Sequence, residues 1–210
     1  MSREAGRGRD RVAGSILRRY RWNPAPGGQE GRPGGEKGKA MDLRSYIRDV
    51  PDFPKKGILF RDITPLLASP GAFAESISQF KKVAYDLHPD LVAGIESRGF
   101  LFGTPLAQEL AAGFIPIRKP GKLPWQTIRA EYSLEYGTDA VEMHKDAAGP
   151  GQRVIVVDDL LATGGTVEAA CRLVEEAGAE VAACLFLVEL TDLGGRERVA
   201  SFPVESLVQF

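Results

Sequence analysis

The sequence has few of the residues from which metal centres and disulfide frameworks are built. It contains two cysteines and two histidines among 210 residues, and their wide separation does not make a zinc site. Cys171 falls in a helical pattern, and Cys184 falls in the apolar run from Val181 to Val188. We expect both thiols to be reduced and packed inside a cytoplasmic protein.

The sequence also lacks a strong net charge and a long apolar run. Its formal net charge is −1, which gives no general attraction to nucleic acid or to anionic membranes. No apolar run approaches the roughly 20 residues that are needed to cross a bilayer. We therefore expect a soluble protein that has neither a membrane nor a nucleic acid as its partner.

Residues 1–40 differ in composition from the rest of the chain. They hold ten Lys/Arg, four Asp/Glu and twelve Gly/Pro, so their net charge is +6, whereas residues 41–210 carry −7. Such a segment cannot bury a core, so we expect disorder over 1–40 and one domain over 41–210. Three interpretations are open: a basic nucleic-acid-binding arm, a targeting peptide, or translated sequence upstream of the working start codon. Low serine content, Glu4 and Asp10 weigh against a transit peptide.

From residue 41 onward, the hydrophobic pattern predicts alternating helices and strands. Asp42 is suited to cap a short helix that runs through Val50, and Ser69 with Pro70 is suited to start a longer helix. Further strands are expected at 91–95, 114–118, 153–157 and 181–188. Further helices are expected at 99–112 and 166–177, ended by Gly113 and Gly178.

This order of elements is typical of an α/β protein with a parallel, doubly wound sheet and right-handed crossovers. One insertion interrupts it between Lys119 and Gly149, where Gly, Pro and alternating residues replace the longer periodic patterns. We expect this insertion to form a two-stranded flap at the carboxyl end of the strands, where it can cover a substrate.

The run from Val154 to Thr166, VIVVDDLLATGGT, carries the strongest functional signal. Its four β-branched residues indicate a strand that is buried on both faces of the sheet. Asp158 and Asp159 follow, and two carboxylates at that edge can accept hydrogen bonds from the hydroxyls of a ribose. The alternative is that the acids only cap the next helix, but adjacent acids at a buried strand end are costly unless a ligand uses them.

The next five residues, Ala162 to Thr166, are suited to bind a phosphate. They lead into the helix at 166–177, so their free N–H groups and the helix dipole can converge on an anion. Gly164 and Gly165 let the backbone come close, and Thr163 and Thr166 add hydroxyl donors. No G-x-x-x-x-G-K-[ST] is present and no G-x-G-x-x-G opens the helix, so neither a P-loop nor a dinucleotide fold is supported. The run therefore predicts a sugar-phosphate site.

This run resembles the phosphoribosyl pyrophosphate signature of the type I phosphoribosyltransferases, in the form DDLLATGGT that is typical of members acting on adenine. Other segments match that family in order and spacing over residues 41–210: Pro51-Asp52-Phe53-Pro54, Leu59-Phe60-Arg61-Asp62-Ile63, Ser97-Arg98-Gly99-Phe100-Leu101-Phe102-Gly103, Arg118-Lys119, Gly121-Lys122-Leu123-Pro124 and Tyr132-Ser133-Leu134-Glu135-Tyr136-Gly137. The resemblance implies a central parallel sheet flanked by helices, a short N-terminal hood and an antiparallel flap. Met41 falls where chains of this family normally begin, which favours the third interpretation of residues 1–40.

The resemblance implies that the loop from Glu96 to Gly99 binds pyrophosphate. Ser97 and Arg98 are expected to hold the diphosphate, Arg98 also as a catalytic residue, together with N–H groups at the start of a helix. A cis peptide bond is expected between Glu96 and Ser97. The alternative is that Arg98 only pairs with Glu96 on a surface loop.

The flap is expected to supply further groups. The resemblance implies that Lys119, Lys122 and Tyr136 bind phosphoribosyl pyrophosphate or AMP. Glu135, between Leu134 and Tyr136, is expected to be the acid–base residue. It can exchange a proton with the purine or steady positive charge on the sugar, and its position does not separate these roles.

The base site is expected in the hood. The resemblance implies that Leu59, Phe60 and Arg61 recognise adenine through backbone groups, while Phe60 and Leu160 sandwich its ring. Ala162 stands where enzymes for 6-oxopurines usually carry an acid, which favours adenine.

The resemblance implies an enzyme of purine salvage that transfers 5-phosphoribosyl from phosphoribosyl pyrophosphate to adenine and gives AMP and pyrophosphate. We expect a homodimer with Mg²⁺ held mainly through the diphosphate, and no protein side chain as a direct metal ligand. Two alternatives stay open: a phosphoribosyltransferase for another purine such as xanthine, and a non-catalytic regulator that senses phosphoribosyl pyrophosphate. The presence of Glu135, Arg98 and both lysines weighs against the regulator.

Overall fold

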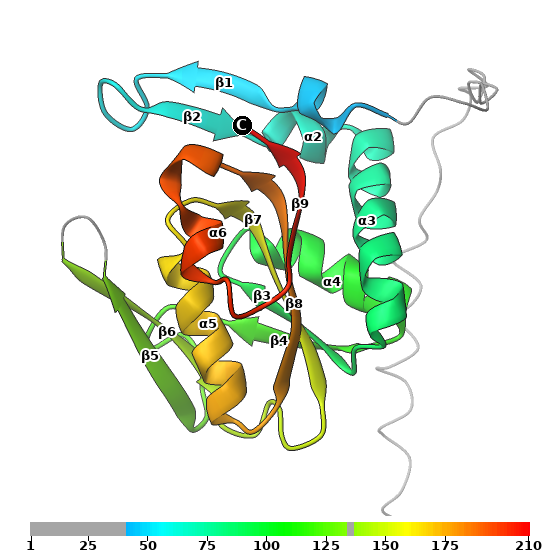
Figure 1. The fold of residues 1–210 in the computed structure, drawn as a ribbon, viewed down its shortest axis with the longest axis vertical. Coiled ribbons are helices and arrows are strands. Elements are labelled where there is room, and N and C mark those ends of the chain that lie inside the picture. The colour runs from blue at the N-terminus through cyan, green and yellow to red at the C-terminus, as the bar shows by residue number, and fades with distance from the viewer. Residues whose placement is uncertain (1–40, 134–136) are drawn as a thin grey trace, which may run out of the picture. The chain divides into compact units, whose positions relative to one another are not determined.

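The core of the fold is one five-stranded parallel sheet. The computed structural model describes residues 41–133 and 137–210, so the expectation for residues 1–40 falls outside it. The strand order is β4-β3-β7-β8-β9, and every neighbouring pair is parallel (Figure 1). The strands span β3 Leu91–Ile95, β4 Gly113–Ile117, β7 Arg153–Leu161, β8 Glu180–Glu189 and β9 Val204–Gln209.

Helices cover both faces of this sheet, as the doubly wound prediction requires. Helices α3 (Pro70–Ala84) and α4 (Gly99–Leu110) pack on one face, and α5 (Gly165–Glu176) packs on the other. The alternation of side chains along β7 supplies both layers, because Val154 and Val156 join the core under α5 whereas Ile155 and Val157 join the core under α3 and α4. All four are fully buried, which explains the unbroken apolar run.

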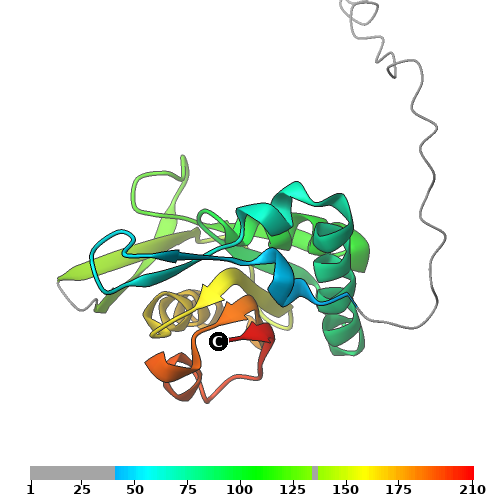
Figure 2. The ribbon, with the colours of Figure 1, turned by 90° about the horizontal axis from the view of Figure 1, so that it is seen from above.

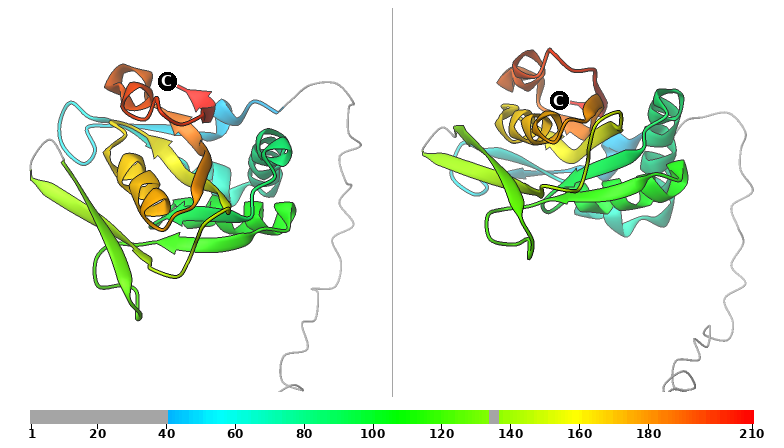
Figure 3. Two further views of the ribbon diagram at one scale, coloured as in Figure 1. Left: turned by 60° about the horizontal axis from the view of Figure 1, so that its bottom comes forward. Right: turned by 90° about the horizontal axis from the view of Figure 1, so that it is seen from below.

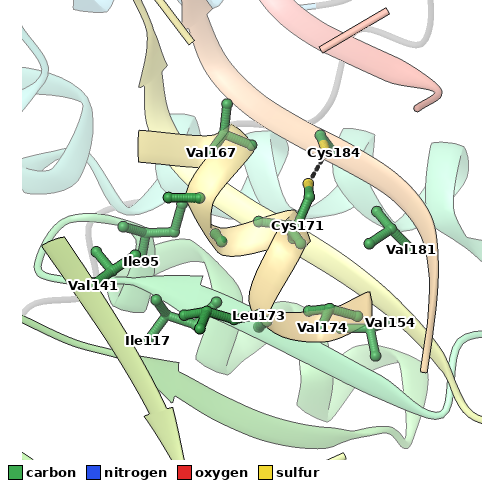
Figure 4. Packing of buried hydrophobic residues seen from close by; sticks show 14 of the residues in the cluster. Ile95, Ile117, Val141, Val154, Val167, Cys171, Leu173, Val174, Val181 and Cys184 are labelled. Carbon is green, nitrogen blue, oxygen red and sulfur yellow. Dashed lines mark hydrogen bonds between the residues drawn. The ribbon is translucent and has the colours of Figure 1, made fainter. Parts of the chain in front are cut away.

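The core under α5 also settles the environment of the two cysteines. Cys171 on α5 faces Cys184 on β8 with 3.4 Å between the Sγ atoms, and both are free and buried (Figure 4). The hydrogen bond with the Cys184 thiol and burial raise the pKa of Cys171, so both sulfurs pack as small apolar groups.

Both predicted helix caps are present, but the helices that they begin differ in length. Ser69 accepts a hydrogen bond from the Ala72 N–H and begins α3, as predicted. Asp42 accepts one from the Arg44 N–H, but the helix that it caps is a single 3-10 turn. The remaining short helices are η1 Leu43–Tyr46, α2 Thr64–Ala68, η2 Tyr85–Leu87, η3 Thr191–Leu193 and α6 Gly195–Arg198.

Two local predictions were wrong. The helix begun at Asp42 does not run through Val50, because β1 (Arg48–Pro51) pairs antiparallel with β2 (Leu59–Asp62) and forms the hood. The helix α4 does not end at Gly113. Its last turn closes at Ala111, whose φ of 53° takes the left-handed conformation, and Gly113 instead begins β4. A Cβ at Gly113 would come within 2.7 Å of the Leu91 side chain on the neighbouring strand.

The hood and the flap lie outside the main sheet. The hood lies across the carboxyl edge, above the ends of β7 and β8 (Figures 1 and 2). The flap strands β5 (Thr127–Ser133) and β6 (Thr138–His144) pair antiparallel, as predicted, and pack beside α5 (Figure 3). Paired backbone hydrogen bonds of 2.9 and 2.7 Å between Arg118 and Glu142 fasten β6 to the residue after β4. Among the described residues, none of the helices combines the length and the apolar character that crossing a membrane requires.

Candidate active site

Strand β7 carries the signature acids to the carboxyl edge of the sheet. Its pairing with β3 ends at Val157, whereas its pairing with β8 continues to Leu161. The strand thus extends four residues past its predicted end at Val157. Asp158 and Asp159 belong to this extension, where β7 has no neighbouring residue on β3. This explains how one strand is buried at its start and offers side chains to a ligand at its end.

The two acids are held in an environment that disfavours their charge. Asp159 is only 4% exposed, and the Asp158 Oδ1 accepts a 2.9 Å hydrogen bond from the Asp159 N–H. Burial raises the pKa of Asp158 well above its usual range, and the neighbouring Asp159 charge adds to the increase. Burial also raises the pKa of Asp159, although the Arg98 guanidinium opposes this. Two such carboxyls gain from ligand hydroxyls that donate to them.

Arg98 joins the loop after β3 to the signature acids. Its Nε lies 3.0 Å from the Asp159 Oδ2, so the surface pair with Glu96 that was the alternative does not form. Glu96 instead accepts hydrogen bonds from the Arg118 Nε at 3.2 Å and from the Lys119 N–H at 2.9 Å. Burial opposes the charge of Glu96, but these hydrogen bonds outweigh it and leave the pKa lowered.

The loop after β3 has the backbone that the sequence predicted. The Glu96–Ser97 peptide bond is cis. Ser97 is exposed. No side chain caps the N–H groups at the start of α4. Because Arg98 projects from the same turn, the loop presents both a guanidinium and a helix N-terminus to an anion.

The loop from Ala162 to Thr166 wraps a small cavity at the start of α5. The cavity has a volume of about 80 Å³, and Asp158, Leu160 and Phe186 line it together with the loop. No side chain caps α5, so no side-chain cap occupies its first N–H groups. Gly164 has a φ of 80°, which a residue with a side chain adopts only at a cost. The structure thus brings Asp158 and the predicted phosphate residues together around one cavity, whereas Asp159 does not line it.

Helix α6 contributes residues that the sequence analysis did not single out. A Cβ at Gly195 would lie 2.3 Å from the Ala162 carbonyl oxygen, and one at Gly164 would lie 2.8 Å from the Gly195 carbonyl oxygen. Arg198 donates from its Nε to the Glu168 Oε2 at 2.8 Å and so ties α6 to the first turn of α5. These contacts join segments about 30 residues apart, so no local sequence pattern predicts them.

The flap lysines differ in their surroundings. The Lys119 Nζ donates to the Tyr132 hydroxyl at 2.7 Å and also contacts the Asp139 carboxylate. Burial would lower the pKa of Lys119, but the hydrogen bonds with Asp139 and Tyr132 outweigh it and raise the pKa, so the charge is retained. Lys122 is exposed, and its carbonyl oxygen accepts from the Arg118 Nη1 at 3.2 Å. Glu135 and Tyr136 lie outside the described residues.

The hood residue Phe60 faces the loop after β3. The Arg98 guanidinium carbon lies 5.8 Å from the centroid of the Phe60 ring, so the hood and the loop after β3 meet at this point. Leu59 is exposed, and the Arg61 side chain is directed to Asp49 and Phe210. Leu160, the other expected base contact, lines the cavity at the start of α5.

The described residues offer no ready-made cage for a metal. No group of three or more His, Cys, Asp or Glu side chains in residues 41–133 and 137–210 is arranged to hold one. At the site, Asp159 is instead paired with Arg98, and Asp158 accepts from the Asp159 N–H. This donor set fits a Mg²⁺ ion that arrives bound to diphosphate oxygens and water, since Mg²⁺ usually keeps several waters and takes few protein ligands.

Comparison with known proteins identifies the family. A family model of the phosphoribosyl transferase domain matches residues 64–205. An adenine phosphoribosyltransferase of Rhodopirellula baltica is 55% identical over 170 residues, which cover 81% of this chain and 82% of that protein. The crystal structure of adenine phosphoribosyltransferase from Thermoanaerobacter pseudethanolicus is 54% identical, with a TM-score of 0.78 over 80% of this chain and 98% of that chain.

A ligand complex is also among the similar structures. The Saccharomyces cerevisiae adenine phosphoribosyltransferase, complexed with adenine and D-2,5-dideoxy-2,5-imino-altritol 1,6-bisphosphate, is 43% identical, with a TM-score of 0.76 over 79% of this chain and 96% of that chain. The predicted fold and family are therefore confirmed. The chain belongs to the adenine phosphoribosyltransferases of the phosphoribosyl transferase family.

Proposed function

We propose a residue-by-residue account of how this chain transfers a 5-phosphoribosyl group from phosphoribosyl pyrophosphate to adenine and gives AMP and pyrophosphate. The observation that carries the account is the ion pair between Arg98 and Asp159. It joins the loop that is suited to a diphosphate to the acids that are suited to a ribose, and the phosphate loop continues directly from those acids. The three parts of phosphoribosyl pyrophosphate thus have three adjoining sites.

In this account the phosphate binds at the N-terminus of α5. The backbone N–H groups from Ala162 to Thr166 and the hydroxyls of Thr163 and Thr166 donate to its oxygens. Asp158 and Asp159 accept from the ribose hydroxyls, which adds donors to the Asp159 N–H and the Arg98 Nε that these carboxyls already have. A ligand that supplies donors stabilises the charged carboxylates, so binding should lower the pKa of both.

The diphosphate binds between the loop after β3 and the flap. Ser97 and Arg98 contact it from one side, and Lys119, Lys122 and Tyr136 contact it from the other. The Arg98 guanidinium offers several donors in one plane, so it can bind the diphosphate while it stays close to Asp159. The raised pKa of Lys119 keeps its ammonium charged throughout the neutral range, as a diphosphate contact requires.

Adenine binds under the hood. Backbone groups of Leu59 and Arg61 recognise its edge, and Phe60 and Leu160 stack on its faces. The closeness of Arg98 to Phe60 supports this placement, because the base must lie near the carbon that loses the diphosphate. Ala162 adds no acid at the phosphate loop. The adenine phosphoribosyltransferase relatives support adenine over xanthine as the base.

The chemical step inverts the anomeric carbon through a transition state that resembles an oxocarbenium ion. Holding the purine nitrogen in line with this carbon contributes up to roughly 7 to 11 kcal/mol. Glu135 exchanges a proton with the purine or stabilises the positive sugar, and Arg98 stabilises the departing diphosphate. Closure of the flap excludes water, which would otherwise hydrolyse the activated sugar.

Mg²⁺ would be held through the diphosphate rather than by Asp158 and Asp159, which are assigned to the ribose and, for Asp159, to Arg98. When bound, the ion supplies positive charge that offsets the charge of the leaving group. The residues of the chain supply the orientation, the donors and the exclusion of water.

The remaining proposals concern the whole molecule. We propose that residues 41–210 are the catalytic domain, that residues 1–40 are dispensable, that the enzyme acts in the cytoplasm and that it is a homodimer. Light scattering after size-exclusion chromatography tests the last point, and a monomer that retains full activity would contradict it.

The decisive experiment measures AMP formation by the full chain and by residues 41–210. Phosphoribosyl pyrophosphate and Mg²⁺ are supplied with adenine, hypoxanthine, guanine or xanthine separately, and Glu135→Ala serves as the control. We expect adenine-selective turnover that survives trimming and drops in the control. Turnover with another base alone would contradict the base site, and tight substrate binding without turnover would identify a regulator.

A further inference from the structure

The aromatic ring of Phe210 lies between two arginines from the N-terminal part of the described chain. The guanidinium carbon of Arg61 on β2 is 3.9 Å from the ring centroid, and that of Arg44 in η1 is 4.1 Å from it. Figure 1 marks the end of β9, where Phe210 follows, beside β2. These distances are short for a cation–π contact, which acts within about 6 Å.

The ring is fixed to the main sheet. The Phe210 N–H donates to the Glu189 carbonyl oxygen at 2.9 Å. The Phe210 carbonyl oxygen accepts from the Thr191 N–H at 3.0 Å and from the Thr191 hydroxyl at 2.9 Å. The Arg44 Nη1 also donates to the Gln209 carbonyl oxygen at 2.6 Å. The backbone of Phe210 is therefore held by Glu189 at the end of β8 and by Thr191 of η3, not by the hood.

Arg61 is held from a second direction by the hood itself. Its Nη1 forms an ion pair with the carboxylate of Asp49, which lies opposite Arg61 in the β1–β2 register. The Arg61 side chain is only 16% exposed, while Asp49 is 54% exposed. The guanidinium is thus shared between an acid of the hood and an aromatic ring of the main sheet, and it connects the two.

We propose that Phe210 is a positioning residue for the adenine site. By holding Arg61, it fixes the height of β2 over the carboxyl edge, and with it the adjacent Phe60 ring that faces Arg98. This inference rests on the proposed role of Leu59–Arg61 in binding adenine. Phosphoribosyl pyrophosphate is bound by other elements, so the effect of Phe210 should fall on one substrate only.

The test compares Phe210→Leu with Phe210→Tyr in the full chain. Steady-state KM values are measured for adenine and for phosphoribosyl pyrophosphate with Mg²⁺, together with thermal unfolding. Phe210→Leu retains apolar bulk but removes the ring, so we expect the KM for adenine to rise about three- to thirty-fold. The KM for phosphoribosyl pyrophosphate should change less than about two-fold. Phe210→Tyr keeps the ring and should restore the KM for adenine.

Asp49→Asn provides a second perturbation that does not touch the main sheet. Because Asp49 is exposed, its replacement should leave folding intact while it weakens the other hold on Arg61. We expect a selective rise in the KM for adenine, smaller than that of Phe210→Leu. The inference is overturned if neither variant changes this KM, if both substrates are affected equally, or if tyrosine fails to substitute for phenylalanine.

Phe60→Ala separates this inference from the function on which it rests. If Phe60→Ala leaves the KM for adenine unchanged, the hood is not the base site, and both proposals are overturned. If Phe60→Ala raises the KM for adenine and Phe210→Leu does not, the hood binds the base and only the role of Phe210 is refuted.

Discussion

Replacing Gly195 by alanine should displace the phosphate loop. The added Cβ would lie 2.3 Å from the Ala162 carbonyl oxygen and 2.9 Å from the Leu161 Cδ1, whereas real Cβ contacts stay above 3.0 Å. The carbonyl oxygen must therefore move by at least about 0.7 Å, or α6 must move by the same amount. Gly195 does not have a positive φ, so alanine is compatible with its own backbone conformation.

The displacement acts where the phosphate is proposed to bind. Because a misplacement of about 1 Å can cost about 100-fold in rate, we expect kcat/KM for phosphoribosyl pyrophosphate to fall about 30- to 100-fold. This corresponds to about 2 to 3 kcal/mol of lost transition-state stabilisation. The KM for adenine should change little, because Gly195 contacts the phosphate loop and not the hood.

The assay is AMP formation at saturating adenine with varied phosphoribosyl pyrophosphate, and Gly149→Ala is the matched control. A Cβ at Gly149 has no neighbour within 4 Å, so this control reports the effect of a glycine-to-alanine change alone. Thermal unfolding of both variants shows whether the fold survives. If the Gly195→Ala variant is folded and its kcat/KM lies within about three-fold of the wild-type value, the proposed displacement of the phosphate loop is refuted.

Three further predictions address charge and metal. Hydrogen bonds from Arg196 lower the pKa of Glu189 from 4.5 to about 2, so its stabilising effect is full above the ordinary pKa and is lost as the pH falls from 4.5 to about 2. Glu189→Gln should therefore lower the free energy of unfolding by about 3 kcal/mol at pH 7 and by much less near pH 2. Urea titrations at the two pH values measure this, and an equal loss at both would contradict it. Lys119→Met should raise the KM for phosphoribosyl pyrophosphate about 10- to 100-fold with little change for adenine, and equal effects on both substrates would count against a diphosphate contact. Chelation by EDTA should abolish AMP formation until excess Mg²⁺ is restored, and turnover that persists without divalent ions would exclude the proposed role of the metal.

Local patterns predicted the elements that a few neighbouring residues determine. The buried strand 153–157 followed from its apolar run, and the start of α3 followed from Ser69 and Pro70. The helix expected through Val50 was wrong because cross-strand pairing with 59–62, a non-local interaction, decides that segment. Likewise, Gly113 did not end α4, because it pairs with Leu91 of β3 and so begins β4.

The candidate site divides in the same way. The chemistry of the run from Asp158 to Thr166 was predictable from the run alone. Acids, glycines and threonines at a strand-to-helix junction are suited to a sugar phosphate, and this does not depend on the rest of the chain. The partner of Arg98 was left open between a surface pair and a ligand site. Only the packed structure selects Asp159, since the choice depends on how close the ends of β3 and β7 come.

The sequence by itself determined the fold class, the family and the chemistry of the signature, because each depends on residue types at fixed short spacings. The tertiary structure decided which distant segments support that chemistry. It placed Gly195 against Ala162, and it placed Phe210 against Arg61. Contacts between residues separated by tens or hundreds of positions follow from the packing of the whole domain, and no local pattern encodes them.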